Sequence, residues 1–172
     1  INTVVDEAIR AAPPVEFAAY APLKGLPSFL DLSTTLALGE DRRRLEDLGL
    51  AMGATASPGG SGALFLAAAN LAERGEAVLL RDRHWGPYTG FLRGCGLEIE
   101  TYQLLPSSDD GRTPNLDLEG FRDGVARLAK RQGSVMTWLN DPAHNPTGLS
   151  LTPESRYALL DAFMESAAAN EH

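Results

Sequence analysis

Apolar and polar positions along the chain predict short buried strands followed by amphipathic helices. EAVLLRD at 76–82 is a short apolar run between Gly75 and the turn-forming RHWGP, which is typical of a buried parallel strand. LEIETYQL at 97–104 and SVMTWLN at 134–140 predict two further strands. A helix at about 86–94 follows the first strand. The pattern therefore predicts successive βα units.

Two longer helices belong to these units. In 116–131, apolar residues recur at helical spacing and basic residues lie in the last turn, and Gly133 closes the helix. The turn residues of PSSDDGRTPN, 106–115, predict a loop before it. The positions that we expect to face the core in this helix are Leu118, Phe121, Val125 and Leu128.

The last helix begins at TPES, with Thr152 as its N-cap and Pro153 at the first helical position. Both residue types are favoured at these places, since a threonine hydroxyl accepts a backbone N–H and proline lacks the N–H that a first turn leaves unpaired. The residues that we expect to form its apolar face are Leu160, Phe163, Met164 and Ala167.

Repeated βα units favour right-handed crossovers and a mostly parallel sheet with helices on both faces. The predicted fold class is therefore α/β, a three-layer αβα arrangement that is incomplete in this chain. We expect residues 57–172 to hold the βα units, cut short at the C-terminal end, and residues 1–56 to form a lead-in. Within the lead-in, 4–12 and 25–38 predict helices and 12–27 predicts a loop.

Composition indicates an ordinary soluble domain and excludes several classes of function. The 172 residues carry a net charge of -8, which argues against a nucleic-acid surface, and the DRRRLED run at 41–47 indicates a solvated face. No apolar stretch approaches the roughly 20 residues of a membrane-spanning helix. Cys95 is the one cysteine, which excludes an intrachain disulfide and a cysteine metal site and indicates a buried structural thiol. Without a signal-peptide pattern, a cytoplasmic location is expected.

A glycine-rich turn enters a helix in TASPGGSGALFLAAANLAERG, 55–75. Glycines let the backbone approach an anion, Ser61 offers a hydroxyl, and N–H groups of the first helical turn point outward with partial positive charge. This arrangement suits a phosphate group. The alternative is a turn that only starts a helix, and the segment matches neither a Walker A motif nor a dinucleotide-binding fingerprint.

Two further segments leave strands at the edge where ligands bind in parallel sheets. Trp85, in RDRHWGPYTGF, offers an aromatic plane for a flat ring, or packs in the core. His84 has no partner at useful spacing and is expected to be structural or solvent-facing. In NDPAHNPTG, Asn145 precedes Pro146, a bond that can be cis, so a rigid amide is held at a strand end.

These segments together resemble a known family. HNPTG at 144–148 closely resembles the Asn-Pro-Thr-Gly motif of the class I aminotransferases, which depend on pyridoxal phosphate. SPGGSGAL at 57–64 is similar to their phosphate loop, and HWGPY at 84–88 to the segment whose aromatic residue stacks on the cofactor. AAYAPLKGLPSFLDLSTTLALGE at 18–40 is similar to their upstream stretch. The resemblance covers about 18–165, four collinear motifs in all, and favours the aspartate and aromatic branch.

The resemblance implies roles for five residues. Gly60 and Ser61 would hold the cofactor phosphate, Trp85 would stack on the pyridine ring, and Asn145 would bond the phenolic oxygen of the ring. Tyr20 would reach the phosphate of a neighbouring subunit, which implies a homodimer with shared active sites. The chain departs from aspartate aminotransferases by having Tyr88 where they have a histidine, so the partner of the pyridine nitrogen and the substrate choice are in doubt there.

The resemblance also shows what the chain lacks. Transamination needs a lysine that forms a Schiff base with the cofactor, an acid for the pyridinium nitrogen, and an arginine for the substrate carboxylate. The two lysines, Lys24 and Lys130, do not follow strands. In the family these three groups come after the Asn-Pro-Thr-Gly motif. We therefore expect an interior segment of the large domain that is inactive alone and contains no catalytic residue.

The parent protein is expected to transfer an amino group between an L-amino acid, dicarboxylic or aromatic, and a 2-oxo acid. Two alternatives stay open. Carbon–sulfur lyases and related eliminating enzymes of the same fold share the Asn-Pro-Thr-Gly loop. A truncated, non-catalytic binding domain would also lack the lysine. No metal site, nucleic acid or membrane is expected.

Overall fold

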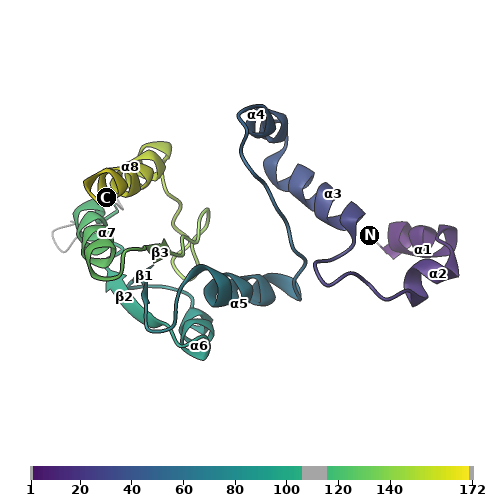
Figure 1. Ribbon diagram of the computed structural model, residues 1–172, viewed down its shortest axis with the longest axis horizontal. Coiled ribbons are helices and arrows are strands. Elements are labelled where there is room, and N and C mark those ends of the chain that lie inside the picture. Colours follow the sequence, from purple (N-terminus) through teal and green to yellow (C-terminus); the bar gives the residue numbers. More distant parts are fainter. Residues whose placement is uncertain (1, 106–115, 171–172) are drawn as a thin grey trace. The chain divides into compact units, whose positions relative to one another are not determined.

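The computed structural model describes residues 2–105 and 116–170, and the predicted loop at 106–115 lies outside the described residues (Figure 1). The chain separates into two compact units at Gly59 and Gly60. Unit one comprises the residues up to Gly59, and unit two those from Gly60 onward. Among the described residues, no helix is both long and apolar enough to cross a membrane.

Unit one is helical. Its elements are α1 (Asn2–Ala11), α2 (Pro14–Ala18), α3 (Pro27–Leu38) and α4 (Asp41–Asp47). The helices predicted at 4–12 and 25–38 are confirmed by α1 and α3. The loop predicted at 12–27 is wrong in its first half, where α2 forms. Pro14 supplies the preset backbone angle of a first helical position, and Glu16 is an acidic residue in the first turn, so both favour a helix start.

Unit one buries little apolar surface. None of the residues in α1, α3 or α4 is buried. The most exposed of its large apolar side chains include Leu23 at 91% and Leu36 at 88%. The solvated face predicted at 41–47 is confirmed for most of α4, although Arg42 is half-buried against α3.

Unit two contains a parallel three-stranded sheet. Its strands are β1 (Ala77–Arg81), β2 (Glu98–Tyr102) and β3 (Met136–Thr137), in the order β2-β1-β3. Leu79 in the central strand pairs with Glu100 on one side and Thr137 on the other. The third strand is shorter than the predicted 134–140. From Trp138 onward the chain leaves the ladder, and the Trp138 ring packs edge-on against Tyr88 instead.

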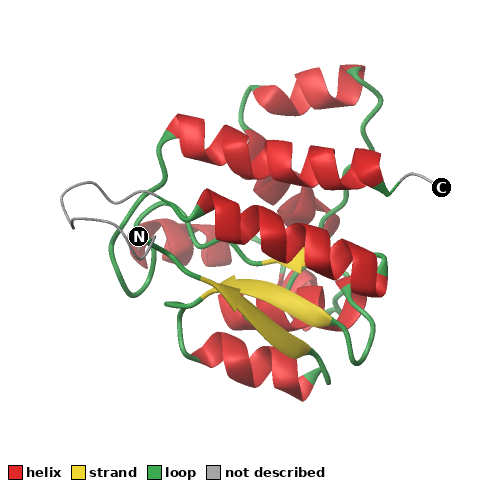
Figure 2. Ribbon diagram, turned by 90° about the vertical axis from the view of Figure 1, so that its left-hand side faces the viewer, coloured by secondary structure: helices red, strands yellow, loops and turns green. Residues whose placement is uncertain are grey.

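Four helices accompany this sheet, and Figure 2 shows the strands with helices on both sides. They are α5 (Gly59–Leu71), α6 (Pro87–Gly94), α7 (Leu118–Gln132) and α8 (Pro153–Ala169). Alternate residues of β1 enter two separate cores. Leu79 packs with α7 and α8, whereas Val78 and Leu80 pack with α5 and α6. All five residues of β1 are therefore buried, and the predicted three-layer αβα fold is confirmed.

The predicted core face of α7 is confirmed, and that of α8 is partly wrong. Leu160 and Met164 are 59% and 72% exposed, whereas Leu159 and Ala162 are buried. Phe163 does pack against the core, edge-on to Phe121 of α7. Apolar residues occur almost all round this alanine-rich helix, so its periodicity allows two neighbouring stripes. Contact with α7 selects the stripe that is buried.

The predicted helix ends in unit two are confirmed. Thr152 Oγ1 accepts the Ser155 backbone N–H at the start of α8, and Asp117 caps α7 through Gly120. Gly133 follows α7 with φ 74°, the left-handed conformation that favours glycine. Cys95, predicted to be buried, is half-buried, and its Sγ lies 3.9 Å from the Phe65 carbonyl oxygen.

Candidate cofactor-binding site

Two segments of unit two converge at the carboxyl edge of the sheet. Because β1 and β3 are parallel neighbours, their last residues, Arg81 and Thr137, end at the same edge. Trp85 follows the first strand end and Asn145 the second. This edge is where ligands bind in open parallel sheets. Helix α5 precedes β1, and its Ala68 packs in the same core as Val78 and Leu80.

A continuous line of contacts joins Trp85 to Asn145. Tyr88, which is buried, meets the Trp85 ring edge-on at 5.6 Å and 88°. Its hydroxyl oxygen accepts a hydrogen bond from Asn140 Nδ2 at 3.1 Å. Asn140 Oδ1 in turn accepts the Asn145 backbone N–H at 3.4 Å. The structure thus links two of the residues that the sequence proposes for cofactor binding.

The half-buried Trp85 ring keeps a face without a stacked partner among the described residues. Tyr88 contacts it perpendicularly, and the Phe91 ring is tilted by 51° at a centroid distance of 6.2 Å. Neither neighbour lies parallel to the indole. Stacking of a flat aromatic group on an indole favours an offset geometry.

Asn145 lies in a loop that we call the Asn145 loop, residues 140–151. The His144 N–H donates to the Leu149 carbonyl at 2.7 Å, and the Gly148 N–H donates to the His144 carbonyl at 2.6 Å. His144 Nδ1 and Thr147 Oγ1 lie 2.8 Å apart. Asn145 itself is exposed, and its side-chain amide makes no hydrogen bond with any described residue. The Asn145–Pro146 bond, which the sequence allows to be cis, is cis.

The N-terminus of α5 presents small residues and unpaired polar groups. Gly59 has φ 70°, and an added Cβ at Gly59 or at Gly60 would meet no atom within 4 Å. Ser57 Oγ donates to the Gly59 carbonyl at 2.9 Å, which tightens the turn. The Ser61 hydroxyl makes no hydrogen bond with the part of the chain that the structure describes. An anion could accept from this hydroxyl and from the first-turn N–H groups.

The other two positions singled out from the sequence differ. Tyr20 belongs to unit one, where its side chain is 88% exposed. His84 is structural, as expected. Its Nδ1 lies 2.8 Å from the Arg81 carbonyl oxygen, and its ring is nearly parallel to that of Tyr88 at 6.3 Å.

Two side chains of the Asn145 loop, those of His144 and Asp141, have shifted pKa values. Burial, together with the charges of Arg81 and His84, lowers the pKa of His144 and keeps the imidazole neutral, while Asp141 opposes the shift. Burial alone would raise the pKa of Asp141. Hydrogen bonds from the Leu151 N–H and from Arg156 outweigh burial, so the pKa of Asp141 is lowered and its carboxylate is ionised at neutral pH.

Sequence reasoning missed Asn140 and Asp141. Asn140 bonds both Tyr88 and Asn145, and Asp141 bonds Leu151 and Arg156. One signal was available, because two polar residues directly after an apolar strand are common at ligand-binding edges. Their partners, however, appear only when the loop closes.

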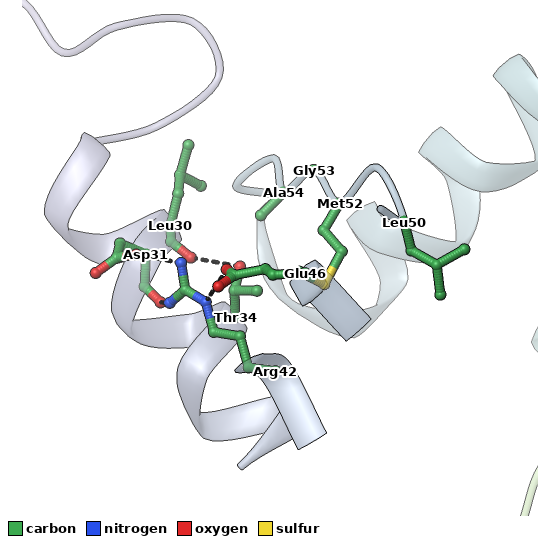
Figure 3. A pocket seen from close by; sticks show the side chains of 9 residues that line it. All are labelled: Leu30, Asp31, Thr34, Arg42, Glu46, Leu50, Met52, Gly53 and Ala54. Atoms are coloured by element: carbon green, nitrogen blue, oxygen red, sulfur yellow. Dashed lines mark hydrogen bonds and ion pairs between the residues drawn. The ribbon is translucent and has the colours of Figure 1, made fainter. Parts of the chain in front are cut away.

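A separate hollow of about 290 Å³ lies within unit one (Figure 3). Arg42 crosses it, and its guanidinium bonds the Asp31 and Glu46 carboxylates at 2.6 and 3.1 Å. These hydrogen bonds raise the pKa of Arg42. With its donors engaged, Arg42 has a structural role in joining α3 to α4. No cluster of metal-ligating side chains occurs in residues 2–105 or 116–170.

Known proteins of similar sequence and structure share one chemistry. The profile of the family described as "Aminotransferase class I and II" matches residues 1–168. The mitochondrial aspartate aminotransferase of Schizosaccharomyces pombe is 28% identical over 88% of this chain and 36% of its own length. The aspartate aminotransferase of Arabidopsis thaliana named cytoplasmic isozyme 2 is 31% identical over 78% of this chain and 32% of its own length. The chain thus spans about a third of these relatives.

Solved structures agree on the fold. An aminotransferase from Anaerococcus prevotii superposes with a TM-score of 0.80 at 20% identity, over 95% of this chain and 38% of that protein. An aromatic-amino-acid aminotransferase of Burkholderia pseudomallei, with a TM-score of 0.72 at 20% identity over 94% of this chain and 38% of its own, was solved with pyridoxal phosphate covalently bound. The chain belongs to the class I and II aminotransferase family, whose cofactor is pyridoxal phosphate.

Proposed function

We propose that this chain forms the cofactor-holding part of an aminotransferase that moves an amino group between an L-amino acid, dicarboxylic or aromatic, and a 2-oxo acid. The observation that supports it most is the line of contacts from Trp85 through Tyr88 and Asn140 to Asn145. It holds an aromatic face and a free amide at one edge of the sheet. Aspartate and aromatic aminotransferases among the relatives and neighbours support the substrate class.

The described residues fit pyridoxal phosphate by the chemistry of their donors. The Ser61 hydroxyl and the first-turn N–H groups at Gly60 suit the phosphate. The open indole face of Trp85 suits the ring, and the free Asn145 amide suits the phenolic oxygen. Each of these groups is unpartnered within the described part of the chain, so none must break a hydrogen bond to bind.

Each side chain has a stated task in this proposal. Gly60 and Ser61 bind the phosphate, Trp85 orients the ring and keeps water from one face, and the Asn145 amide donates to the ring oxygen. When bound, pyridoxal phosphate supplies a conjugated ring that accepts electron density from the amino acid. Tyr20 is proposed to act in the site of a second subunit, in a cytoplasmic homodimer.

The covalent anchor is proposed to be a lysine outside the 172 residues. Lys130 lies in α7, two residues before Gln132. The Gln132 side chain bonds the N–H and C=O of Ala77, the first residue of β1. The carboxyl edge of the sheet, where the cofactor is proposed to bind, lies at the other end of β1. That end is ~13 Å from Ala77 at 3.3 Å per residue. Lys24 belongs to unit one, where its backbone carbonyl accepts the Ala56 N–H. We therefore propose that the chain alone binds the cofactor without amino transfer.

Binding is tested by titrating the chain with pyridoxal phosphate and following tryptophan fluorescence. Asn145→Ala should weaken binding about ten- to a hundredfold, because one hydrogen bond to a charged oxygen is lost. Asn70→Ala is the matched control, since Asn70 is an exposed asparagine whose Nδ2 bonds Leu66 within α5. Equal effects of the two substitutions would contradict the assignment of Asn145.

The reaction is tested on the full-length protein with L-aspartate or L-phenylalanine and 2-oxoglutarate. We expect glutamate to form in step with the new 2-oxo acid. Release of ammonia together with sulfide, when L-cysteine is supplied as the substrate instead, would identify an eliminating enzyme. In the 172-residue chain, borohydride reduction should leave Lys24 and Lys130 unmodified, and a cofactor adduct on either would refute the proposed anchor.

A further inference from the structure

We infer that Asp141 is a positioning residue for Asn145, because its carboxylate closes the base of the Asn145 loop, fastens the loop to α8, and serves as counter-charge to the buried Arg81 at the end of β1. The positioning role rests on the proposed function. The closure of the loop and the pairing of charges do not, and they can be tested without a cofactor.

The carboxylate of Asp141 makes both of its connections through short contacts. Oδ1 accepts the Leu151 backbone N–H at 2.7 Å, which joins the two ends of the Asn145 loop. Oδ2 lies 2.8 Å from Arg156 Nε and 2.8 Å from Arg156 Nη2, in the first turns of α8. The Asp141 side chain is only 12% exposed, whereas that of Arg156 is 49% exposed. Asp141, which belongs to the loop, is therefore the partner that is shielded from solvent.

The loop above this base is held by its own hydrogen bonds. The Ala143 N–H donates to Ser150 Oγ at 2.9 Å, and the His144 N–H donates to the Leu149 carbonyl. These bonds connect the two arms in sequence order outward from Asp141 and Leu151. Asn145 lies beyond them, in the turn that the arms close. Its placement therefore depends on whether the base stays shut.

Arg81 adds a reason for a carboxylate at this place. Its side chain is almost fully buried, and its Nε donates to the Tyr102 hydroxyl at 3.3 Å. Its Nη2 has no hydrogen-bond partner within residues 2–105 and 116–170. Arg81, Ser150 and Leu151 line the same small cavity of about 20 Å³, so Arg81 lies close to the residue that Asp141 binds at the loop base. The charge of Arg81 also contributes to the low pKa of Asp141.

The first experiment measures charge pairing in the full-length protein without cofactor. Asp141→Asn keeps the size of the side chain and an acceptor for the Leu151 N–H, but removes the charge. It should lower the equilibrium constant for folding about tenfold or more, because Arg156 loses its ion-pair partner and the buried Arg81 guanidinium loses its counter-charge. Arg81→Met alone removes the buried guanidinium, and with it the need for a counter-charge. In the double variant the two losses should fall short of additivity by at least about threefold.

A control cycle uses Arg122, which makes a surface ion pair with Glu165 on α8. Arg122→Met combined with Asp141→Asn should be additive. Equal additivity in both cycles would refute the pairing of Arg81 with Asp141. Failure of Arg81→Met to fold would also refute it. In this variant no buried guanidinium needs a counter-charge, and Asp141 keeps Arg156 as its partner, so the variant should fold.

The second experiment measures the position of the loop by amide hydrogen exchange. In Asp141→Asn the amides of His144 and Gly148 should exchange at least about tenfold faster than the loss of global stability explains, with Leu79 as the global reporter. Unchanged relative protection would refute the clamp.

The last readout connects the clamp to Asn145. Asp141→Asn should weaken pyridoxal phosphate binding about three- to tenfold in the native sequence. It should add nothing in an Asn145→Ala background. An equal loss in both backgrounds would show a general structural effect and refute positioning. If the native protein fails to bind the cofactor, the proposed function is wrong, while the exchange and stability cycles still decide the clamp.

Discussion

Tyr88 connects three residues that come from two segments of the chain, 84–88 and 138–140. Its ring contacts Trp85 and Trp138 edge-on, and its hydroxyl accepts from Asn140. A histidine, which aspartate aminotransferases have here, would be smaller than this tyrosine. At this position the phenol of Tyr88 supports both the indole of Trp85 and the loop that begins at Asn140.

The hydrogen bond of Tyr88 gives the first prediction. Tyr88→Phe should lower the free energy of unfolding by about 1 kcal/mol, because the ring contacts remain but Asn140 loses an acceptor in a half-buried place. Tyr157→Phe is the control, since Tyr157 is 69% exposed and should show no change. Denaturant unfolding measures both variants. Equal stability of Tyr88→Phe and the native chain would contradict the prediction.

The second prediction concerns pH. The folded chain holds the pKa of His144 below its ordinary value of 6.5, so an unfolded chain takes up a proton that the folded chain resists. The contribution of His144 to the free energy of unfolding should be fully present above pH 6.5, and it should be lost as pH drops through the lower, folded pKa. His144→Gln should remove this part of the slope between pH 7 and 5. A slope that persists in the variant would show that other groups cause it.

At this scale the sequence predicted residue types better than contacts. Asn145, Trp85 and Ser61 were chosen because their chemistry and their place after strands or before a helix are visible in the sequence. Their binding roles stay predictions. Asp141 could not be chosen, since its partners Leu151 and Arg156 meet it only after the loop closes and α8 docks.

At the scale of elements, two glycines predict opposite results for the same substitution. Gly133 has φ 74° after α7, and Gly90 lies inside α6, and an added Cβ would meet no atom within 4 Å at either place. Gly133→Ala should destabilise by about 1 kcal/mol from backbone strain, whereas Gly90→Ala should stabilise by about 0.5–1 kcal/mol. Thermal unfolding compares them. The same sign at both positions would contradict this explanation.

Element types followed from periodicity, whereas faces and ends depended on neighbours. The stripe of α7 was predicted because polar residues surround it. The stripe of α8 was ambiguous, and only Phe163 of the predicted set packs into the core with Leu159 and Ala162. Strand β3 ended early because Trp138 packs against Tyr88, a partner that sequence spacing does not reveal.

At the scale of the whole molecule, burial is concentrated in unit two. Every fully buried apolar side chain among the described residues lies there, with β1 at the centre of both cores. We predict that amides of Ala77–Arg81 exchange slowest and those of α1 and α3 fastest in the 172-residue chain. Mass-spectrometric hydrogen exchange measures this order. Comparable protection of α3 and β1 would refute it.

The fold class was predictable because strands and helices alternate at the lengths that parallel sheets require. The lack of buried residues among the described positions of unit one was not predictable, since the apolar spacing there resembles that of helices that pack in their own domain. Leu32, Leu36 and Phe29 are all exposed in α3. Periodicity shows that a helix has an apolar side, but not whether this stretch of chain supplies the cover.

Tyr88 also limits how this site can diverge. A substitution that resizes the residue would shift the indole plane of Trp85 and the arm bearing Asn145 in one step, because both rest on the same phenol. Variation in this lineage should therefore change positions 85, 88 and 140 as a set, and lone replacements at 88 should be rare among functional descendants.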